Sequence, residues 1–345
     1  MTAKEWLEWL ALRPAASGLE RPVLDEIAQR VSAWTDESHL DAAGNLVLIR
    51  HGQGQGPLLL LAAHIDQICL WVKDILPGGF LQVVAPGIHP QVLPGARVQI
   101  GEFQGVIAMT PPHLRRTAPS ATDSGSDLVA VDLGETEETV RGAVRPGDPV
   151  FFAAVSSGMG EDRFTGAGLD NRASVTATLL ALESLVGLSP WVDLAVVLTS
   201  SEEAGLIGAS AAGVGLHPDL ALAVDVTYGR GLDTPVDLTV PLGHGPAIGR
   251  GPNCHLGLER FLIRAARHAR LPFQVEVMAG NSGTDAWALQ VSAGGVRTGT
   301  VSVPLLYMHT PAEVVSLADI RCTASLLGEA VQLLDQDSYQ EIVQW

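Results

Sequence analysis

The stretch PLLLLAAHIDQICLWV, residues 57–72, is the most apolar run in the chain. Residues 58–63 are apolar at consecutive positions, so both faces of a strand here would be buried, which is typical of a central strand in a parallel sheet. His64 and Asp66 interrupt the run, so it does not predict a membrane span. After residue 67 the sequence pattern changes to short β-like runs separated by Gly and Pro. The stretch therefore predicts the centre of one domain and the beginning of another.

The rest of the chain also divides into α/β segments and a β-rich segment. Amphipathic helices are predicted before residue 45, and helices alternate with apolar strands from Asp170 onward. This alternation predicts an α/β sandwich with a mostly parallel sheet. We expect a discontinuous catalytic domain at 1–67 and 163–345, interrupted by a small all-β domain at 68–162. Within the insert, residues 111–127 are rich in Pro, Ser, Thr and Asp and predict a mobile loop.

Composition excludes several function classes. The chain has 345 residues, with 21 Lys and Arg against 38 Asp and Glu, a net charge of −17. Binding to nucleic acid or an anionic membrane needs clustered basic residues, so neither is expected. The three cysteines are too far apart for a CxxC zinc site or a disulfide framework. Charged residues interrupt the N-terminal 20 residues, which do not resemble a secretory signal, so we expect a soluble cytoplasmic protein.

Acidic and histidine residues gather where predicted strands end or, in one case, just before a helix that follows TGAGLD. In an open α/β sheet the carboxyl ends of the strands form the crevice where ligands bind. Taken singly, such residues have plainer explanations, such as a helix cap or a solvated turn. Taken together without basic partners, they would be unstable as a dry cluster. The residues are His64, Asp170, Glu202, Glu203, Asp225 and His309.

Divalent cations would resolve this repulsion. Two histidines and three carboxylates, namely His64, Asp170, Glu203, Asp225 and His309, suit zinc or cobalt, with manganese also compatible, better than calcium or magnesium. We expect two ions per chain, with Asp170 as the bridging carboxylate. Asp66, two residues after His64, is predicted to orient its imidazole.

Glu202 lies beside the predicted ligand Glu203 and is left without a metal to bind. A carboxylate in that position suits a general base. The hypothesis is hydrolysis, in which Glu202 deprotonates a metal-activated water that attacks a carbonyl, and then passes the proton to the leaving amine.

Six spaced motifs of the chain resemble one family. They occur in the order AAHIDQI, GLDNRAS, SSEEAGLIGA, AVDVT, GTDAWAL and YMHTPAEVVSLADI. Together they resemble the tetrahedral (TET) aminopeptidases, which are glutamyl-aminopeptidase-like, dinuclear-metal exopeptidases. The insert, with GFLQVVAPGIHPQVLPGARVQI, resembles the small β-barrel or PDZ-like domain of these enzymes.

The resemblance implies a phosphorylase/peptidase-like α/β domain and removal of N-terminal residues from short peptides. It also implies a homo-oligomer, often of twelve subunits, with contacts made by the β insert. The metal ligands of the family fall on the five residues named above, its catalytic glutamate on Glu202, and its histidine-orienting aspartate on Asp66.

Some positions depart from the family pattern. Gln67 and Cys69 stand where relatives often have Glu and Gly, and Leu306 stands where relatives often have Arg. Loss of that arginine argues against a preference for acidic N-terminal residues. Candidate substrate-binding residues are Thr284 and Asp285 in a glycine-containing stretch, and more weakly His255.

Two alternatives stay open at this point. A related dinuclear-metal dipeptidase, carboxypeptidase or N-acyl amino acid deacylase would use the same metals on a different amide. A non-catalytic assembly or peptide-binding protein would use only the β insert and would bind no metal.

Overall fold

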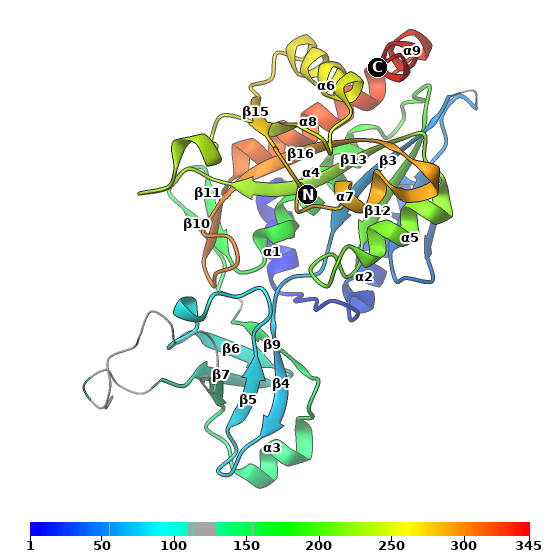
Figure 1. Cartoon of the computed structure of the whole chain (residues 1–345). Coiled ribbons are helices and arrows are strands. Elements are labelled where there is room, and N and C mark those ends of the chain that lie inside the picture. The colour runs from blue at the N-terminus through cyan, green and yellow to red at the C-terminus, as the bar shows by residue number, and fades with distance from the viewer. Residues whose placement is uncertain (55, 110–112, 114–128, 154) are drawn as a thin grey trace. The chain divides into compact units, whose positions relative to one another are not determined.

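The computed structural model describes residues 1–54, 56–109, 113, 129–153 and 155–345 (Figure 1). Its contacts divide the chain into two compact units. The first contains Met1–Gln67, Ser156–Met308 and Glu313–Trp345, and the second contains Ile68–Val155 and His309–Ala312. Apart from His113, the loop predicted at 111–127 lies outside the described residues.

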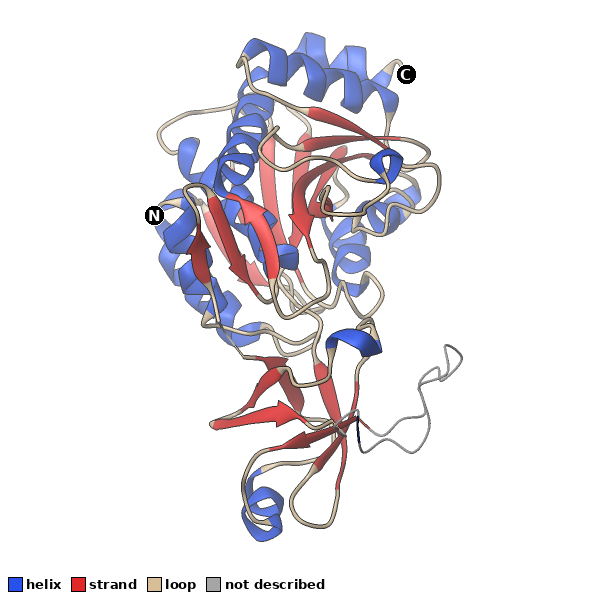
Figure 2. Cartoon of the chain, turned by 90° about the vertical axis from the view of Figure 1, so that its left-hand side faces the viewer, coloured by secondary structure: helices blue, strands red, loops and turns tan. Residues whose placement is uncertain are grey.

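The first unit carries a mixed sheet with helices on both faces (Figure 2). The strand order is β1-β2-β12-β3-β13-β16-β17-β11-β10, and β14 joins β15 to β16. The neighbouring strands β12, β3, β13 and β16 are parallel, and antiparallel strands flank them. The strands are β1 (Glu37–Leu40), β2 (Leu46–Arg50), β3 (Leu58–His64), β10 (Ser157–Met159), β11 (Arg163–Gly166), β12 (Asp193–Thr199), β13 (Leu220–Tyr228), β14 (Ala247–Arg250), β15 (Gln274–Val277), β16 (Arg297–Leu306) and β17 (Glu313–Ser316).

Strand β3 explains why the opening run is apolar at every position. Leu59 and Leu61 belong to a core cluster shared with α1, α2, α4, α6 and α8, whereas Leu60 and Ala62 belong to another, shared with α5 and α7. Because successive side chains of a strand point to opposite faces, burial on both sides requires continuous apolar sequence. The helices are α1 (Ala3–Ala11), α2 (Arg21–Val31), α4 (Leu169–Ser184), α5 (Ile207–Leu216), α6 (Leu256–His268), α7 (Ala286–Leu289), α8 (Leu317–Leu333) and α9 (Gln336–Val343), with 3-10 turns at Ser32–Trp34, Val236–Leu238 and Ser292–Gly294.

The second unit is a closed barrel with the strand order β4-β5-β8-β7-β6-β9, in which every pairing is antiparallel. Its core includes Leu70, Leu81, Val98 and Val150, all fully buried. Its elements are β4 (Leu70–Ile75), β5 (Leu81–Val84), β6 (Arg97–Ile100), β7 (Phe103–Ile107), β8 (Val129–Asp132), β9 (Pro149–Phe152), α3 (Glu137–Ala143) and a 3-10 turn at Pro90–Val92.

The predicted fold class, an α/β sandwich with a small all-β insert, is confirmed. The contacts end the insert at Val155 and not at 162, because β10 pairs with β11 in the sheet of the first unit. The edge strand β1 and the terminal helix α9 were not predicted from the sequence. Among the described residues, no helix is both long and apolar enough to span a membrane.

Candidate metal centre

Three parallel strands deliver the central residues of the site to one edge of the sheet. Thr199 at the end of β12 is in register with His64 at the end of β3. Glu202 follows β12 by three residues, and Asp225 lies in the second half of β13, the other neighbour of β3. Because parallel strands end at the same edge, these side chains converge there, as the sequence predicted.

The imidazole of His64 is surrounded by carboxylates. Its Nε2 lies 3.2 Å from Asp170 Oδ1, 3.5 Å from Asp225 Oδ1 and 4.0 Å from Glu202 Oε2. All four side chains are buried, with 9% or less of each residue exposed. Among the described residues, neither Glu202 nor Asp225 forms an ion pair with Lys or Arg. One basic group, the imidazole of His64, is thus shared by several buried carboxyls.

The pKa values of these groups are shifted by burial and by the neighbouring charges. Burial raises the pKa of Glu202 to about 9; the His64 charge opposes this rise, and nearby carboxylates add to it. Burial likewise raises the pKa of Asp225, against the hydrogen bond and charge of His64. Burial alone would lower the pKa of His64, but the surrounding carboxylates raise it well above its usual value. Burial and mutual repulsion thus favour the neutral forms of these carboxyls.

Asp66 holds the residues at this edge of the sheet in place. Its carboxylate accepts hydrogen bonds from Ser17 Oγ at 2.7 Å and from the backbone N–H groups of Glu202 and Glu203 at 3.1 and 3.2 Å. Its Oδ1 also lies 3.5 Å from His64 Nδ1. These donors and His64 lower the pKa of Asp66 despite its burial. Asp66 thus fixes both the imidazole and the turn that carries the two glutamates.

A second group of donor atoms adjoins the first. Asp170 and Glu203 offer carboxylate oxygens within 4.8 Å of one another, and His64, Glu202 and Asp225 offer donor atoms at similarly short separations. The remaining predicted ligand, His309, lies in the segment His309–Ala312 that groups with the second unit, where its Nδ1 is 3.0 Å from the carbonyl oxygen of Gly87. Its role as a ligand stays a prediction.

The donor set fits divalent transition metals. Imidazole with carboxylates is typical of zinc, cobalt or manganese sites, and a bound cation would oppose the burial that raises the pKa values of Glu202 and Asp225. Bound cations would relieve the repulsion between the buried carboxylates around His64.

The sequence and structure of the chain are similar to those of known aminopeptidases. The model of the family described as M42 glutamyl aminopeptidase matches residues 44–326. The chain belongs to the M42 glutamyl aminopeptidase family.

Several relatives cover nearly the whole chain. The lysyl aminopeptidase of Pyrococcus furiosus is 33% identical over 91% of this chain and 92% of its own length. An aminopeptidase of the archaeon Desulfurococcus kamchatkensis has 32% identity and a TM-score of 0.89, covering 99% of this chain and 97% of its own. The TET1 peptidase of Pyrococcus horikoshii, which can assemble into a tetrahedron or a large octahedral shell, has 28% identity and a TM-score of 0.83, covering 96% and 100%.

The predicted substrate-binding residues of this M42 family member lie in different surroundings. Asp285 is buried, accepts a hydrogen bond from Thr199 Oγ1 at 2.5 Å, and feels the charges of His64 and Asp225. Thr284 Oγ1 accepts the N–H of Ala286 and so supports the start of α7. His255 is the N-cap residue just before α6 and lines a separate pocket of about 500 Å³. Asp285 is therefore the one of the three that the charges tie to the centre.

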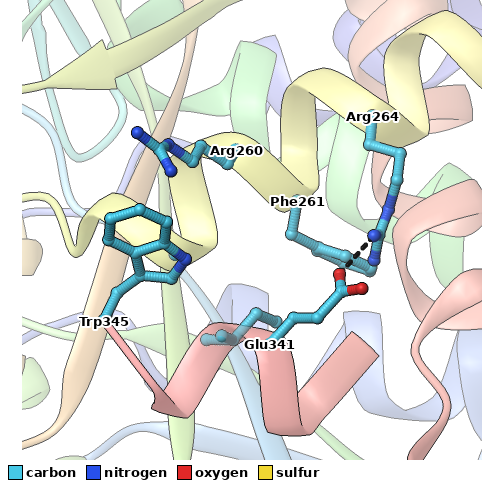
Figure 3. Close-up of a pocket in the computed structure, with 7 residues that line it drawn as sticks. Arg260, Phe261, Arg264, Glu341 and Trp345 are labelled. Atoms are coloured by element: carbon cyan, nitrogen blue, oxygen red, sulfur yellow. Dashed lines mark hydrogen bonds and ion pairs between the residues drawn. The ribbon is translucent and has the colours of Figure 1, made fainter. Parts of the chain in front are cut away.

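Another pocket of this M42 family member, of about 320 Å³, lies between α6 and α9 (Figure 3). Arg260 stacks on Trp345 there, and Arg264 pairs with Glu341. None of the predicted site residues lines it.

Several residues that support the site carry no signal in the sequence pattern. Glu20 accepts the N–H of Ser201 at 2.8 Å, and Glu313 accepts the N–H of Asp170 at 3.2 Å. The buried Arg172 donates to the Gln67 side chain and to carbonyls that include Gly168. Gly168 has a φ of 67°, and a Cβ there would lie 2.1 Å from Arg172 Nη1, so glycine is required. Only the acidic character of Glu20 and Glu313 is visible in the sequence, because their partners are far away along the chain.

Proposed function

We propose that this M42 family member is an aminopeptidase that removes N-terminal residues from short peptides, using two divalent transition-metal ions and Glu202 as general base. The proposed ligands are His64, Asp170, Glu203, Asp225 and His309, with Asp170 as the bridge. The observation that carries the proposal is the set of buried carboxylates around His64, with distances of 3.2 to 4.0 Å and raised pKa values.

Bound cations would polarise the scissile carbonyl and lower the pKa of water, so that water attacks near neutral pH. Glu202 is suited to the proton transfers, since its carboxyl lies in the cluster and the Asp66 carboxylate holds its backbone N–H. Glu202 accepts one proton from the attacking water as the C–O bond forms. It then donates that proton to the amine nitrogen as the C–N bond breaks. We further propose that Asp285 attracts the α-ammonium group of the substrate.

Zinc or cobalt is the proposed metal, with manganese as a further option, because the set mixes imidazole with carboxylates. We also propose a homo-oligomer, a dodecamer, that acts in the cytoplasm, with the barrel unit making subunit contacts. Support comes from the tetrahedral assembly of the Pyrococcus horikoshii TET1 peptidase, with which this chain shares 28% identity.

The experiment is the variant Glu202→Gln, which keeps the size of the side chain but cannot accept the proton. We expect kcat on leucyl arylamide to fall by about 10²–10⁴-fold, while two metal ions per chain remain by elemental analysis. The exposed Glu138→Gln on α3 changes net charge equally and should match the wild type in both measurements. Near-normal turnover in Glu202→Gln would refute the role of Glu202.

The same assay separates the alternatives. An aminopeptidase cleaves aminoacyl arylamides and spares N-acylated amino acids, whereas a deacylase does the reverse. A dipeptidase cleaves dipeptides and spares longer peptides. A non-catalytic scaffold would retain no stoichiometric transition metal after purification in its presence.

A further inference from the structure

The turn that follows β12 and carries Glu202 is held by side chains from distant parts of the chain. Residues 200–203 share one feature, which is that the backbone N–H of each donates to a side-chain oxygen. The acceptors along the turn are Asn45 at 2.9 Å, Glu20 at 2.8 Å and, for the last two residues, Asp66 at 3.1 and 3.2 Å. Tertiary contacts therefore shape this turn at every residue.

The side chain of Glu20 serves the turn and not its own helix. Glu20 stands at the N-cap of α2, where a side-chain oxygen usually accepts N–H groups of the helix itself. Within the described chain, the Glu20 side chain makes no such capping bond. Its Oε1 instead accepts the N–H groups of Gly18 at 2.9 Å and of Ser201 at 2.8 Å. Because Glu20 is only 3% exposed, its carboxyl depends on such donors in place of water.

The backbone of Ser201 needs to be held. Its φ is 53°, in the left-handed region that residues with a Cβ rarely adopt. Such a conformation costs about 1–3 kcal/mol and persists only where the surrounding structure fixes it. Hydrogen bonds fix it on both sides, since the N–H of Ser201 donates to Glu20 and its carbonyl oxygen accepts the N–H of Ile207 at 3.2 Å. Loss of the Glu20 acceptor would free the first of these two peptide groups.

The conformation of Ser201 determines where the next side chain, that of Glu202, points. Glu202 is buried, and its Oε2 lies 4.0 Å from His64 Nε2. A general base must lie within hydrogen-bond reach of the proton that it accepts, and a misplacement of about 1 Å can cost about 10²-fold in rate. Asp66 holds the N–H of Glu202 itself, whereas the residue before it is held by Glu20.

We propose that Glu20 is a positioning residue for Glu202 and acts by holding Ser201 in its left-handed conformation. The inference rests on the proposed aminopeptidase function. It makes the loop between α1 and α2 part of the active site, because Ser17 in the same loop donates to Asp66 at 2.7 Å. One loop thus holds the turn twice, directly through Glu20 and indirectly through Asp66.

The test separates the reach of the Glu20 side chain from its charge. Glu20→Gln keeps an acceptor oxygen at the same reach, whereas Glu20→Asp keeps the charge at the N-terminus of α2 but is one methylene shorter. In the metal-loaded full chain, Glu20→Asp should lower kcat on leucyl arylamide by about 10- to 100-fold. Its KM should change by less than about threefold, and its metal content should not change. Glu20→Gln should keep kcat within about threefold of the wild type.

Two further measurements ask how the loss arises. In the Glu202→Gln background, Glu20→Asp should lower the residual kcat by less than about threefold, because no base remains to be positioned. Hydrogen exchange gives a readout that does not depend on turnover. In the metal-free protein, the Ser201 amide should exchange about 10-fold faster in Glu20→Asp than in the wild type. Unchanged exchange of the β12 amides shows that the variant is folded.

The matched control is Glu138→Asp, which removes the same methylene from an exposed glutamate in the first turn of α3 and should match the wild type throughout. A normal kcat in Glu20→Asp, an equal loss in Glu20→Gln, or a full loss in the Glu202→Gln background would each overturn the positioning role. These outcomes leave the aminopeptidase function standing, because wild-type cleavage of leucyl arylamide tests it separately. If the wild type cleaves no aminoacyl arylamide, the proposed function fails and this inference fails with it.

Discussion

Asp66 and Asp285 are both buried carboxyls at the carboxyl edge of one sheet, yet the protein treats them in opposite ways. Asp66 accepts hydrogen bonds from Ser17 and two backbone N–H groups, and its pKa is lowered despite its burial. Asp285 accepts one from Thr199, and within the described chain its Oδ1 is buried without a partner. Burial raises its pKa to about 7, against the opposing effect of His64.

This difference separates a structural carboxyl, Asp66, from a carboxyl of the proposed reactive site, Asp285. The charge of Asp66 is balanced by groups of the chain itself, so Asp66 can orient its neighbours. The charges of Asp285, Glu202 and Asp225 have fewer such partners, and in the proposed function they face bound cations and substrate.

The largest expected effect is on the metal-free protein as pH rises. A carboxyl with a raised folded-state pKa is stabilised in its neutral form, so stability falls as pH rises toward that pKa. The raised pKa of His64 acts in the same direction, since its charged form is lost at high pH. With the pKa of Glu202 at about 9 and that of Asp285 at about 7, we expect the free energy of unfolding to drop by about 5 kcal/mol between pH 6 and 9.

Urea unfolding of chelator-treated protein at several pH values measures this drop. Metal-loaded protein is the control, and its stability should be nearly flat over the same range. Metal binding at pH 8 should release protons into a weakly buffered solution. A flat profile for the metal-free protein would show that the edge holds no uncompensated carboxyls.

A smaller loss is expected from Asp66→Ala. The variant removes the acceptor of Ser17 and of the Glu202 and Glu203 backbone, leaving buried donors unsatisfied. The free energy of unfolding should fall by about 3 kcal/mol, and metal affinity should fall by about 10–100-fold.

Ser17→Ala is the matched control, because it removes one donor and leaves the acceptor. Its cost should be about 1 kcal/mol. Equal costs for the two variants would mean that Asp66 is no more than the partner of Ser17.

Asp285→Asn should have the smallest effect, and of the opposite sign. The amide keeps the bond to Thr199 but carries no charge. At pH 8 the metal-free variant should therefore be more stable than the wild type by about 1–2 kcal/mol. The exposed Asp237→Asn should stay within about 0.5 kcal/mol. Destabilisation by Asp285→Asn would place Asp285 with Asp66 on the scaffold side.

Much of this site could be predicted because it lies at strand ends. The apolar runs that end at His64 and precede Glu202 predict buried parallel strands, and geometry then brings their ends together. Asp225 could be predicted in the same way, because it lies toward the end of another apolar run. Glu20 and Glu313 could not be found in this way, because each acts on a residue 143 to 181 positions away.

The sequence by itself determined which strands are buried on both faces and which acids follow them, since side-chain period and apolar run length are local properties. Only the tertiary structure decided which of those acids are satisfied. Asp66 and Asp285 are the same residue type at the same edge, and neither local sequence predicts its pKa. That value depends on burial and on donors that long-range packing supplies, so the division between scaffold and reactive carboxyls arises only when the chain is folded.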